Sequence, residues 1–202
     1  MTSVSSLLDG LTERVFPARM PRSDKRAWAA AETLADLGVL MKDFLYGELS
    51  WSPVHCGVVD DDETGPYIHI LADACLSGFV TTNSQAGWAG IAWTGSYCEC
   101  EAWVTGYIAD SDLEVMQDAI RGTGLVMRQA CRKGAHAGHR RYGFRVCAKA
   151  EEDGFMTERR PRAADVIEDC WLIEIADRVP SRNDVLWPAL ERFAELKAEA
   201  AS

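Results

Sequence analysis

The segment from residue 81 to residue 93 carries the side chains best suited to chemistry. Four hydrogen-bonding side chains fall within five positions: Thr81, Thr82, Ser84 and Gln85. Hydroxyl and amide groups both donate and accept hydrogen bonds, which is what recognition of a small polar ligand requires. Trp88 and Trp93 follow closely enough to add a flat apolar wall. We therefore expect a small-ligand site in this segment.

A simple turn is the alternative explanation of the same residues. Residues 79–81 are predicted to form a short buried strand, and residues 82–87 a loop. Asn, Ser and Gly satisfy their own backbone groups wherever a chain reverses direction, so this composition is also typical of a plain connection between strands. The ligand hypothesis predicts that the loop lines a pocket, whereas the turn hypothesis predicts a solvent-exposed reversal.

Residues 128–145 form an island of Arg, Lys and His in an otherwise acidic chain. Arg140 and Arg141 are candidates to hold a phosphate or carboxylate, because guanidinium groups bind such anions at two points. A solvated hairpin is the alternative. His136 and His139 have no carboxylate or cysteine at helical spacing, so we expect no metal site. One of these histidines is a candidate general acid or base if the segment folds over residues 82–85.

Complete catalytic signatures are missing from the sequence. Neither Ser84 nor Ser96 lies in a nucleophile-elbow pattern, and there is no Walker loop or dinucleotide-binding glycine fingerprint. Paired carboxylates fall where helix starts and loops place them without any catalytic role. We therefore expect no cofactor, and whether the protein is an enzyme stays open.

Length and charge limit the classes of protein that fit. The chain has 202 residues, is 48% hydrophobic and carries a net charge of −10, which suits one sizeable core rather than two. Phosphate binding needs Lys and Arg, so the acidic balance argues against direct nucleic-acid binding, and it also repels anionic membranes. No apolar run is long enough to span a membrane.

The seven cysteines indicate a reducing compartment. Their number is odd, and residues 1–20 lack the continuous apolar core of a signal peptide, so we expect a cytoplasmic protein without structural disulfides. Cys98 and Cys100 do not have the spacing of a zinc knuckle. On a strand they point to the same face, where we expect them to pack as small hydrophobes.

The elements that must position these residues predict an α+β domain. Helices are predicted to begin near residues 23, 33, 66, 110 and 184, and strands to span residues 79–81, 91–93, 98–108, 125–131, 144–149 and 170–176. Ser23 and Thr33 are the expected caps of the first two helices, and Gly78 is the expected stop of the third. The last helix has its apolar residues on one side: Leu186, Leu190, Phe193 and Leu196. This order suits a mostly antiparallel sheet with helices on one face, preceded by an N-terminal helical segment.

Residues 1–21 are expected to form an arm separate from the single domain of residues 22–202. Leu7, Leu8, Leu11 and Val15 form an apolar stripe on a helix too short to be stable alone, and Pro17 and Pro21 separate it from the body. Such a stripe needs a partner surface, so we expect the arm to contribute to a homodimer contact.

Three stretches carry a resemblance to a known family. They are SDKRAWAAAETLADLG at residues 23–38, DDETGPYIHILADACLSGFVTTNSQAG at residues 61–87, and DVLWPAL at residues 184–190. Together they resemble a family of uncharacterised actinobacterial proteins known only as a domain of unknown function. Members usually have proline where this chain has Ala86. The helix, glycine, strand and Thr-x-x-Ser order is also similar to a short segment of Taw-type tRNA methyltransferases of the wybutosine pathway, with Gln85 in place of a cysteine.

Two functions remain open from the sequence. The first is binding, with or without processing, of a small anionic ligand such as a nucleotide or nucleotide-derived metabolite. The side chains expected to hold it are Thr81, Thr82, Ser84, Gln85, Trp88, Trp93, Arg140 and Arg141. The second is an interaction or inhibitor protein of a phage or mobile element, whose acidic surface occupies a basic site on a host protein.

Overall fold

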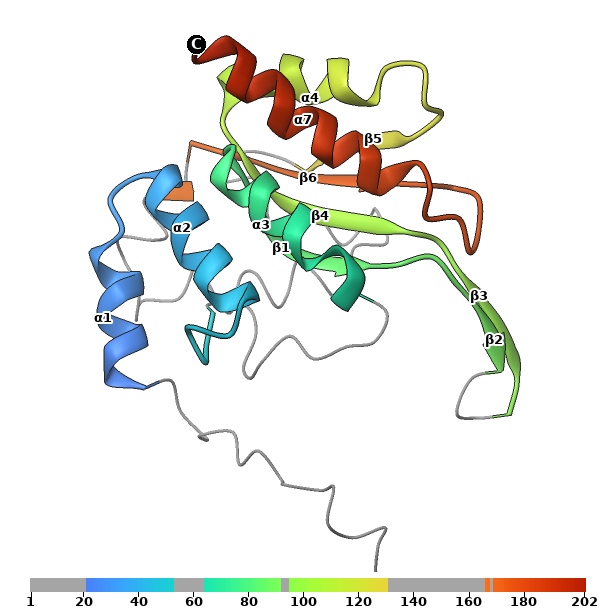
Figure 1. Cartoon of the computed structure of the whole chain (residues 1–202), viewed down its shortest axis with the longest axis horizontal. Helices are drawn as coiled ribbons and strands as arrows, with labels where there is room; N and C mark the ends of the chain where they lie inside the picture. Colours follow the sequence, from blue (N-terminus) through green and yellow to red (C-terminus); the bar gives the residue numbers. More distant parts are fainter. Residues whose placement is uncertain (1–20, 53–63, 92–94, 131–165, 168) are drawn as a thin grey trace, which may run out of the picture.

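The computed structural model describes residues 21–52, 64–91, 95–130, 166–167 and 169–202 (Figure 1). The predicted arm of residues 1–21 lies outside these ranges, apart from Pro21, and so does the predicted strand of residues 144–149. Both therefore stay predictions. Within the described residues the chain has the predicted α+β architecture, with helices and antiparallel sheets.

The first two helices begin where local signals place them. Helix α1 (Arg22–Ala30) starts directly after Pro21, whose carbonyl accepts a hydrogen bond from the amide of Lys25 at 2.9 Å. The predicted Ser23 cap is wrong, because that residue lies inside the first turn. Helix α2 (Leu34–Leu45) has the predicted cap: the Thr33 hydroxyl accepts from the Asp36 amide, and the Asp36 carboxylate accepts from the Thr33 amide.

Helix α3 (Ile68–Leu76) follows a short 3₁₀ turn (Gly65–Tyr67) and lies against α2. A side chain at Gly38 of α2 would place its Cβ 2.2 Å from the carbonyl oxygen of Cys75, so only glycine permits this close crossing. Gly78 ends the helix with φ of +99°, as the sequence predicts.

The main sheet has four antiparallel strands in the order β1-β4-β6-β5. These strands are β1 (Phe79–Gln85), β4 (Trp103–Ile108), β5 (Val126–Ala130) and β6 (Trp171–Ala176). Helices α3, α4 (Leu113–Ile120) and α7 (Leu186–Ala200) lie on the same side of it, and a 3₁₀ turn (Asp110–Asp112) leads into α4 (Figure 1).

Two further strands form a separate ribbon. Strands β2 (Trp88–Ile91) and β3 (Tyr97–Cys100) pair only with each other among the described strands. Because β1 leads into β2 and β3 leads into β4, the ribbon continues the β1–β4 hairpin beyond the sheet (Figure 1). We call these two strands the ribbon and the remainder of the described chain the body.

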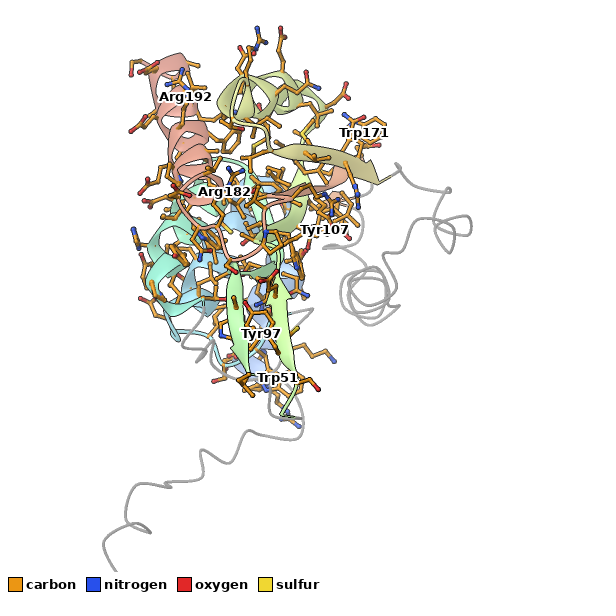
Figure 2. All side chains as sticks on the ribbon, turned by 90° about the vertical axis from the view of Figure 1, so that its right-hand side faces the viewer. Trp51, Tyr97, Tyr107, Trp171, Arg182 and Arg192 are labelled. Carbon is orange, nitrogen blue, oxygen red and sulfur yellow. The ribbon has the colours of Figure 1, made fainter. Side chains whose placement is uncertain are left out.

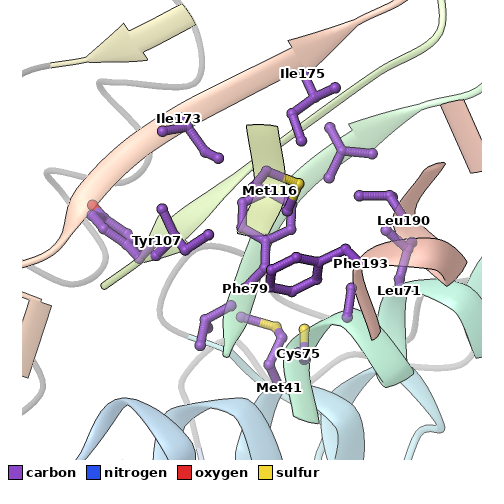
Figure 3. Close-up of a cluster of buried hydrophobic side chains, with 14 of the residues drawn as sticks. Met41, Leu71, Cys75, Phe79, Tyr107, Met116, Ile173, Ile175, Leu190 and Phe193 are labelled. Atoms are coloured by element: carbon purple, nitrogen blue, oxygen red, sulfur yellow. The ribbon is translucent and has the colours of Figure 1, made fainter. Parts of the chain in front are cut away.

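The core lies between the main sheet and its helices (Figure 3). The ring of Phe79 meets the ring of Phe193 from α7 edge-on at a centroid distance of 6.4 Å, and both side chains are fully buried. Gly106 on β4 lies under the Phe79 ring, and a Cβ there would come within 2.8 Å of it. Glycine at this position therefore allows an aromatic residue of β1 to cover the neighbouring strand.

Two sequence predictions about these strands are wrong. Residues 82–85 are not a loop: β1 continues to Gln85, which pairs with Trp103 of β4. A bulge at Thr82 accommodates one extra residue, and pairing with β4 continues on both sides of it. Residues 98–108 are not one strand either, because Glu101 and Ala102 interrupt it between β3 and β4.

Candidate functional site

The structure places Thr81 and Thr82 inside the protein. The Thr81 hydroxyl lies 3.2 Å from Sγ of Cys75 on α3, and its amide donates to the same sulfur at 3.3 Å. The hydroxyl of Thr82 shares a hydrogen bond with that of Thr105 at 3.2 Å, and both side chains are buried. These two hydroxyls therefore join β1 to its neighbours.

Ser84, Gln85 and Trp88 are half-buried along the end of β1 and the start of β2. The amide of Ser84 donates to the side-chain oxygen of Asn83 at 2.9 Å, and the Gln85 side-chain amide donates to the Ala86 carbonyl at 3.2 Å. With Thr81 and Thr82, these three residues are the part of the predicted site that the structure describes.

The other predicted site residues, Trp93, Arg140 and Arg141, lie outside the described residues. The same holds for His136 and His139. The condition for a histidine to act on residues 82–85, that this segment folds over them, therefore falls on residues outside the described ranges.

A side-chain clamp holds the bend between β1 and β2. Oδ1 of Asn183 accepts from the Gly87 amide at 2.7 Å, and its Nδ2 donates to the Gly87 carbonyl at 2.8 Å. A Cβ at residue 87 would lie 2.7 Å from the carbonyl oxygen of Arg182. The bend therefore requires glycine, and both backbone polar groups of Gly87 are satisfied by one amide side chain.

Trp187 supports this clamp from α7. Its indole N–H donates to Oδ1 of Asn183 at 3.2 Å, and its ring stacks on Tyr67 with centroids 4.1 Å apart. The indole is almost completely buried. The orientation of Asn183 is therefore fixed by the packed core rather than by solvent.

An ion pair between Asp177 and Arg182 also supports the clamp, from the loop that carries Asn183. The buried carboxylate accepts from Nε of Arg182 at 2.6 Å and from its terminal nitrogen at 2.7 Å, a two-point pair. Burial raises the pKa of Asp177, but the hydrogen bonds from Arg182 and the Val179 amide outweigh it, and the pKa lies below its usual value. The amide of Asp177 donates to the Ala102 carbonyl at 2.8 Å, which ties this loop to the strand break.

The ribbon has two different faces. Side chains alternate along each strand, so Trp88, Gly90, Cys98 and Cys100 share one half-buried face. Ala89, Ile91, Tyr97 and Glu99 share the other, exposed face. Ile91 lies directly opposite Tyr97, and they are 66% and 64% exposed, respectively. Figure 2 labels Tyr97 on the ribbon, which in Figure 1 projects beyond the helices. We call these the thiol face and the exposed face.

Negative charge accompanies the exposed face. The Tyr97 hydroxyl donates to Oε1 of Glu99 at 2.8 Å, and this hydrogen bond raises the pKa of the Tyr97 phenol. The exposed face is thus an apolar pair beside a carboxylate, which suits contact with an apolar and basic surface.

A polar cluster lies on the sheet face opposite Cys75 and α3. Glu174 of β6 lies opposite both Thr105 of β4 and Arg128 of β5. Its carboxylate is 3.5 Å from Arg128 and 3.8 Å from Arg178, which also binds Glu101 at 2.6 Å. Burial raises the pKa of Glu174 despite these two cations.

Sequence reasoning missed the residues that shape the bend and the ribbon. Asn183, Asp177 and Arg182 act from a loop far along the chain, and no local pattern connects them to Gly87. Ile91 and Tyr97 had a detectable signal: residues 88–91 and 97–100 alternate as a short hairpin would.

The fold and site define an α+β domain with a clamped, projecting ribbon. The chain belongs to the family of domain of unknown function DUF6919, whose model matches residues 23–196. No curated protein matches it. Among the helices of the described ranges, none is long and apolar enough to cross a membrane. In the same part of the chain, no group of three or more His, Cys, Asp or Glu side chains is placed to hold a metal ion.

Proposed function

We propose that this protein is a protein-binding module that docks on an apolar and basic partner surface through the exposed face of its ribbon. The observation that carries the proposal is the Ile91–Tyr97 pair, which is more than 60% exposed at a place that projects from the body. Tyrosine is among the residues enriched at interfaces, since it brings a large apolar area and a hydroxyl.

The clamp makes the ribbon a suitable binding element. A two-stranded ribbon alone is marginally stable in water, so its direction would vary without support. Here Asn183 fixes Gly87, and the Ser181 amide donates to the Cys100 carbonyl at 3.0 Å, so both strands are held where they leave the body. A preorganised element loses less conformational entropy when it binds.

The charge of the chain indicates the chemistry of the partner. A net charge of −10, with Glu99 beside Tyr97, favours a basic docking surface and speeds the encounter with it. An inhibitor that occupies a basic site on a host protein fits this pattern. We propose further that the module acts in the cytoplasm of an actinobacterial cell, as an accessory factor of a phage or mobile element.

Photo-crosslinking tests this proposal directly. A photoreactive residue at position 91 is expected to capture a partner in host-cell lysate that the same residue at exposed Leu76 of α3 does not capture. The partner is then identified, purified and titrated by calorimetry. Ile91→Arg should weaken its binding at least tenfold, and added salt should weaken wild-type binding, while Leu76→Arg should leave affinity unchanged.

Either of two results would contradict the docking surface. Equal capture at positions 76 and 91 would show that the ribbon is not a specific docking surface. Equal affinities of the Ile91→Arg and Leu76→Arg variants would show that the ribbon is not the contact.

A second candidate function is binding of a small anionic ligand, such as a nucleotide, on the polar cluster. The observation that favours it is the pair Arg128 and Arg178 around half-buried Glu174, on the sheet face that Thr105 shares. Asn83 and Gln85 lie opposite Thr105 and Trp103, so their amides are placed toward the same face. Thr81, Thr82, Ser84, Trp88, Trp93, Arg140 and Arg141 remain the predicted contributors from the sequence.

A thermal-shift screen separates this candidate from the first. A nucleotide that binds only the folded protein raises the unfolding midpoint, and Arg128→Gln should abolish the rise. Arg192→Gln on α7 is the matched control with a solvated arginine. No shift with nucleotides or inorganic phosphate at millimolar concentration would reject the site. Product analysis with a shifting nucleotide would decide whether a reaction follows.

The predicted homodimer contact of the arm has its own test. Light scattering on the full chain and on a chain that starts at Arg22 should give the mass of a dimer for the full chain and that of a monomer for the shortened one. The same number of subunits in both would remove the arm from any role in assembly.

A further inference from the structure

The thiol face of the ribbon brings two sulfurs together. Cys98 and Cys100 lie two residues apart on β3, so both side chains point to the same face. Their Sγ atoms are 4.0 Å apart, and both residues are half-buried thiols. Packing as small hydrophobes does not require this approach, so the pair is a separate feature of the ribbon.

The opposite strand places a glycine beside one thiol and a tryptophan beside the other. Gly90 lies opposite Cys98, and Trp88 lies opposite Cys100. The Trp88 ring extends across Gly90, since a Cβ there would be 2.8 Å from Cζ2 of the indole. An apolar ring next to two sulfurs lowers the access of water, which favours soft ligands over hydrated ones.

The sulfur separation fits a shared metal ion better than a disulfide. With metal–sulfur bonds of about 2.3 Å, two thiolates around one ion are about 3.8 Å apart in a tetrahedral, about 4.0 Å apart in a trigonal and about 4.6 Å apart in a linear arrangement, so the observed separation matches the trigonal one. A disulfide needs about 2.05 Å between the sulfurs. Two residues apart on a strand, the Cα atoms are about 6.6–6.8 Å apart, at the outer limit of disulfide geometry.

We propose that Cys98 and Cys100 form a two-thiolate site for one soft metal ion in a low-coordinate, trigonal arrangement, with Cu(I) as the expected type and a small thiol from solution as the third ligand. At the two cysteines, binding breaks two S–H bonds, forms two metal–sulfur bonds and releases two protons to solvent, with no change of oxidation state. Soft thiolates select Cu(I) over the hard cations. Zinc prefers four ligands, and the described residues bring no third or fourth to the pair.

The other described cysteines do not compete for the ion. Cys75 and Cys170 are buried. Burial raises the pKa of each of these thiols to about 11, so they stay protonated at neutral pH. The ribbon pair is therefore the place in the described chain where two thiols are accessible together.

An anaerobic titration of the full chain with Cu(I), in competition with a chromophoric Cu(I) chelator, tests the site. Wild type is expected to take up one equivalent more than the Cys98→Ser/Cys100→Ser variant. Glu99→Gln, which changes the exposed face between the two cysteines, should match wild type. Cysteines elsewhere contribute equally to all three proteins, so the difference isolates the pair. Identical isotherms for wild type and the double variant would overturn the proposal.

A second measurement keeps the test valid if the double variant folds poorly. One equivalent of Cu(I) should protect Cys98 and Cys100 of the wild-type chain from alkylation, as followed by peptide mass spectrometry. Unchanged alkylation at both residues would overturn the site. Zn(II) provides the comparison. If Zn(II) still protected both cysteines at a chelator strength that removes Cu(I), the low-coordination assignment would be wrong.

Discussion

The ribbon and the β1–β4 pair of the main sheet are built from the same two stretches of chain, yet their apolar side chains differ in burial. In the sheet, Phe79 and Ile108 form a fully buried pair, with the Phe79 ring against Phe193 of α7. In the ribbon, Ile91 and Tyr97 form an equivalent cross-strand pair that is mostly exposed. The first pair contributes to the stability of the fold. The second contributes little to it and is free to contribute to binding.

The largest expected effect is on the sheet side of this comparison. Phe79→Ala should lower the free energy of unfolding by about 3–5 kcal/mol, because it leaves a cavity against Phe193. Ile91→Ala, the matched change in the ribbon, should alter it by less than about 0.5 kcal/mol. Urea unfolding followed by circular dichroism measures both. Similar losses for the two variants would end the distinction between body and ribbon.

The next effect concerns the ion pair at the base of the ribbon. Asp177→Asn should lower the free energy of unfolding by about 2–3 kcal/mol at pH 7, because it weakens a two-point pair with a buried carboxylate. The pKa of Asp177 is lowered by folding, so its contribution is present above the unfolded-state pKa and is lost as pH falls through the folded-state pKa. Unfolding titrations from pH 7 down to pH 3 should show the difference in free energy of unfolding between wild type and variant becoming smaller. A difference that grows toward acid pH would contradict this account.

A smaller effect is expected at the clamp. Asn183→Ala should lower the free energy of unfolding by about 1–2 kcal/mol, because both backbone groups of Gly87 lose their partner. Hydrogen exchange should become faster in residues 87–91 than in β4. Ser84→Ala is a suitable control, since the Ser84 side chain is half-buried and outside the clamp. If exchange in the ribbon did not change, Asn183 would not be what holds it.

The smallest effect is on Glu174, a carboxylate only three residues from Asp177 with the opposite pKa shift. Its pKa is raised by burial, so its contribution to stability is full below the unfolded-state pKa and is lost as pH rises through the folded-state pKa. Glu174→Gln should therefore change stability by less than about 1 kcal/mol at pH 7. The stability of wild type relative to the variant should rise as pH falls. A steady loss of this relative stability toward acid pH would show that Arg128 and Arg178, and not burial, dominate the pKa of Glu174.

Local signals in the sequence predicted those features of the body that depend on neighbouring residues. The Thr33 cap, the Gly78 stop and the apolar spacing of α7 each depend on a few neighbouring residues, and the structure has all three. The end of β1 was missed because its strand state depends on pairing with Trp103, which no local pattern reveals. Thr81 and Thr82 looked like ligand-binding groups for the same reason, since Cys75 and Thr105 reach them only in the folded chain.

The contact between Gly87 and Asn183 has a consequence for how the family can vary. The two positions are 96 residues apart in sequence, yet any side chain at residue 87 meets the backbone at Arg182. A relative that replaces this glycine must therefore also change the loop that carries the asparagine. We expect the two positions to co-vary across homologues, so an alignment alone would reveal the join between ribbon and body.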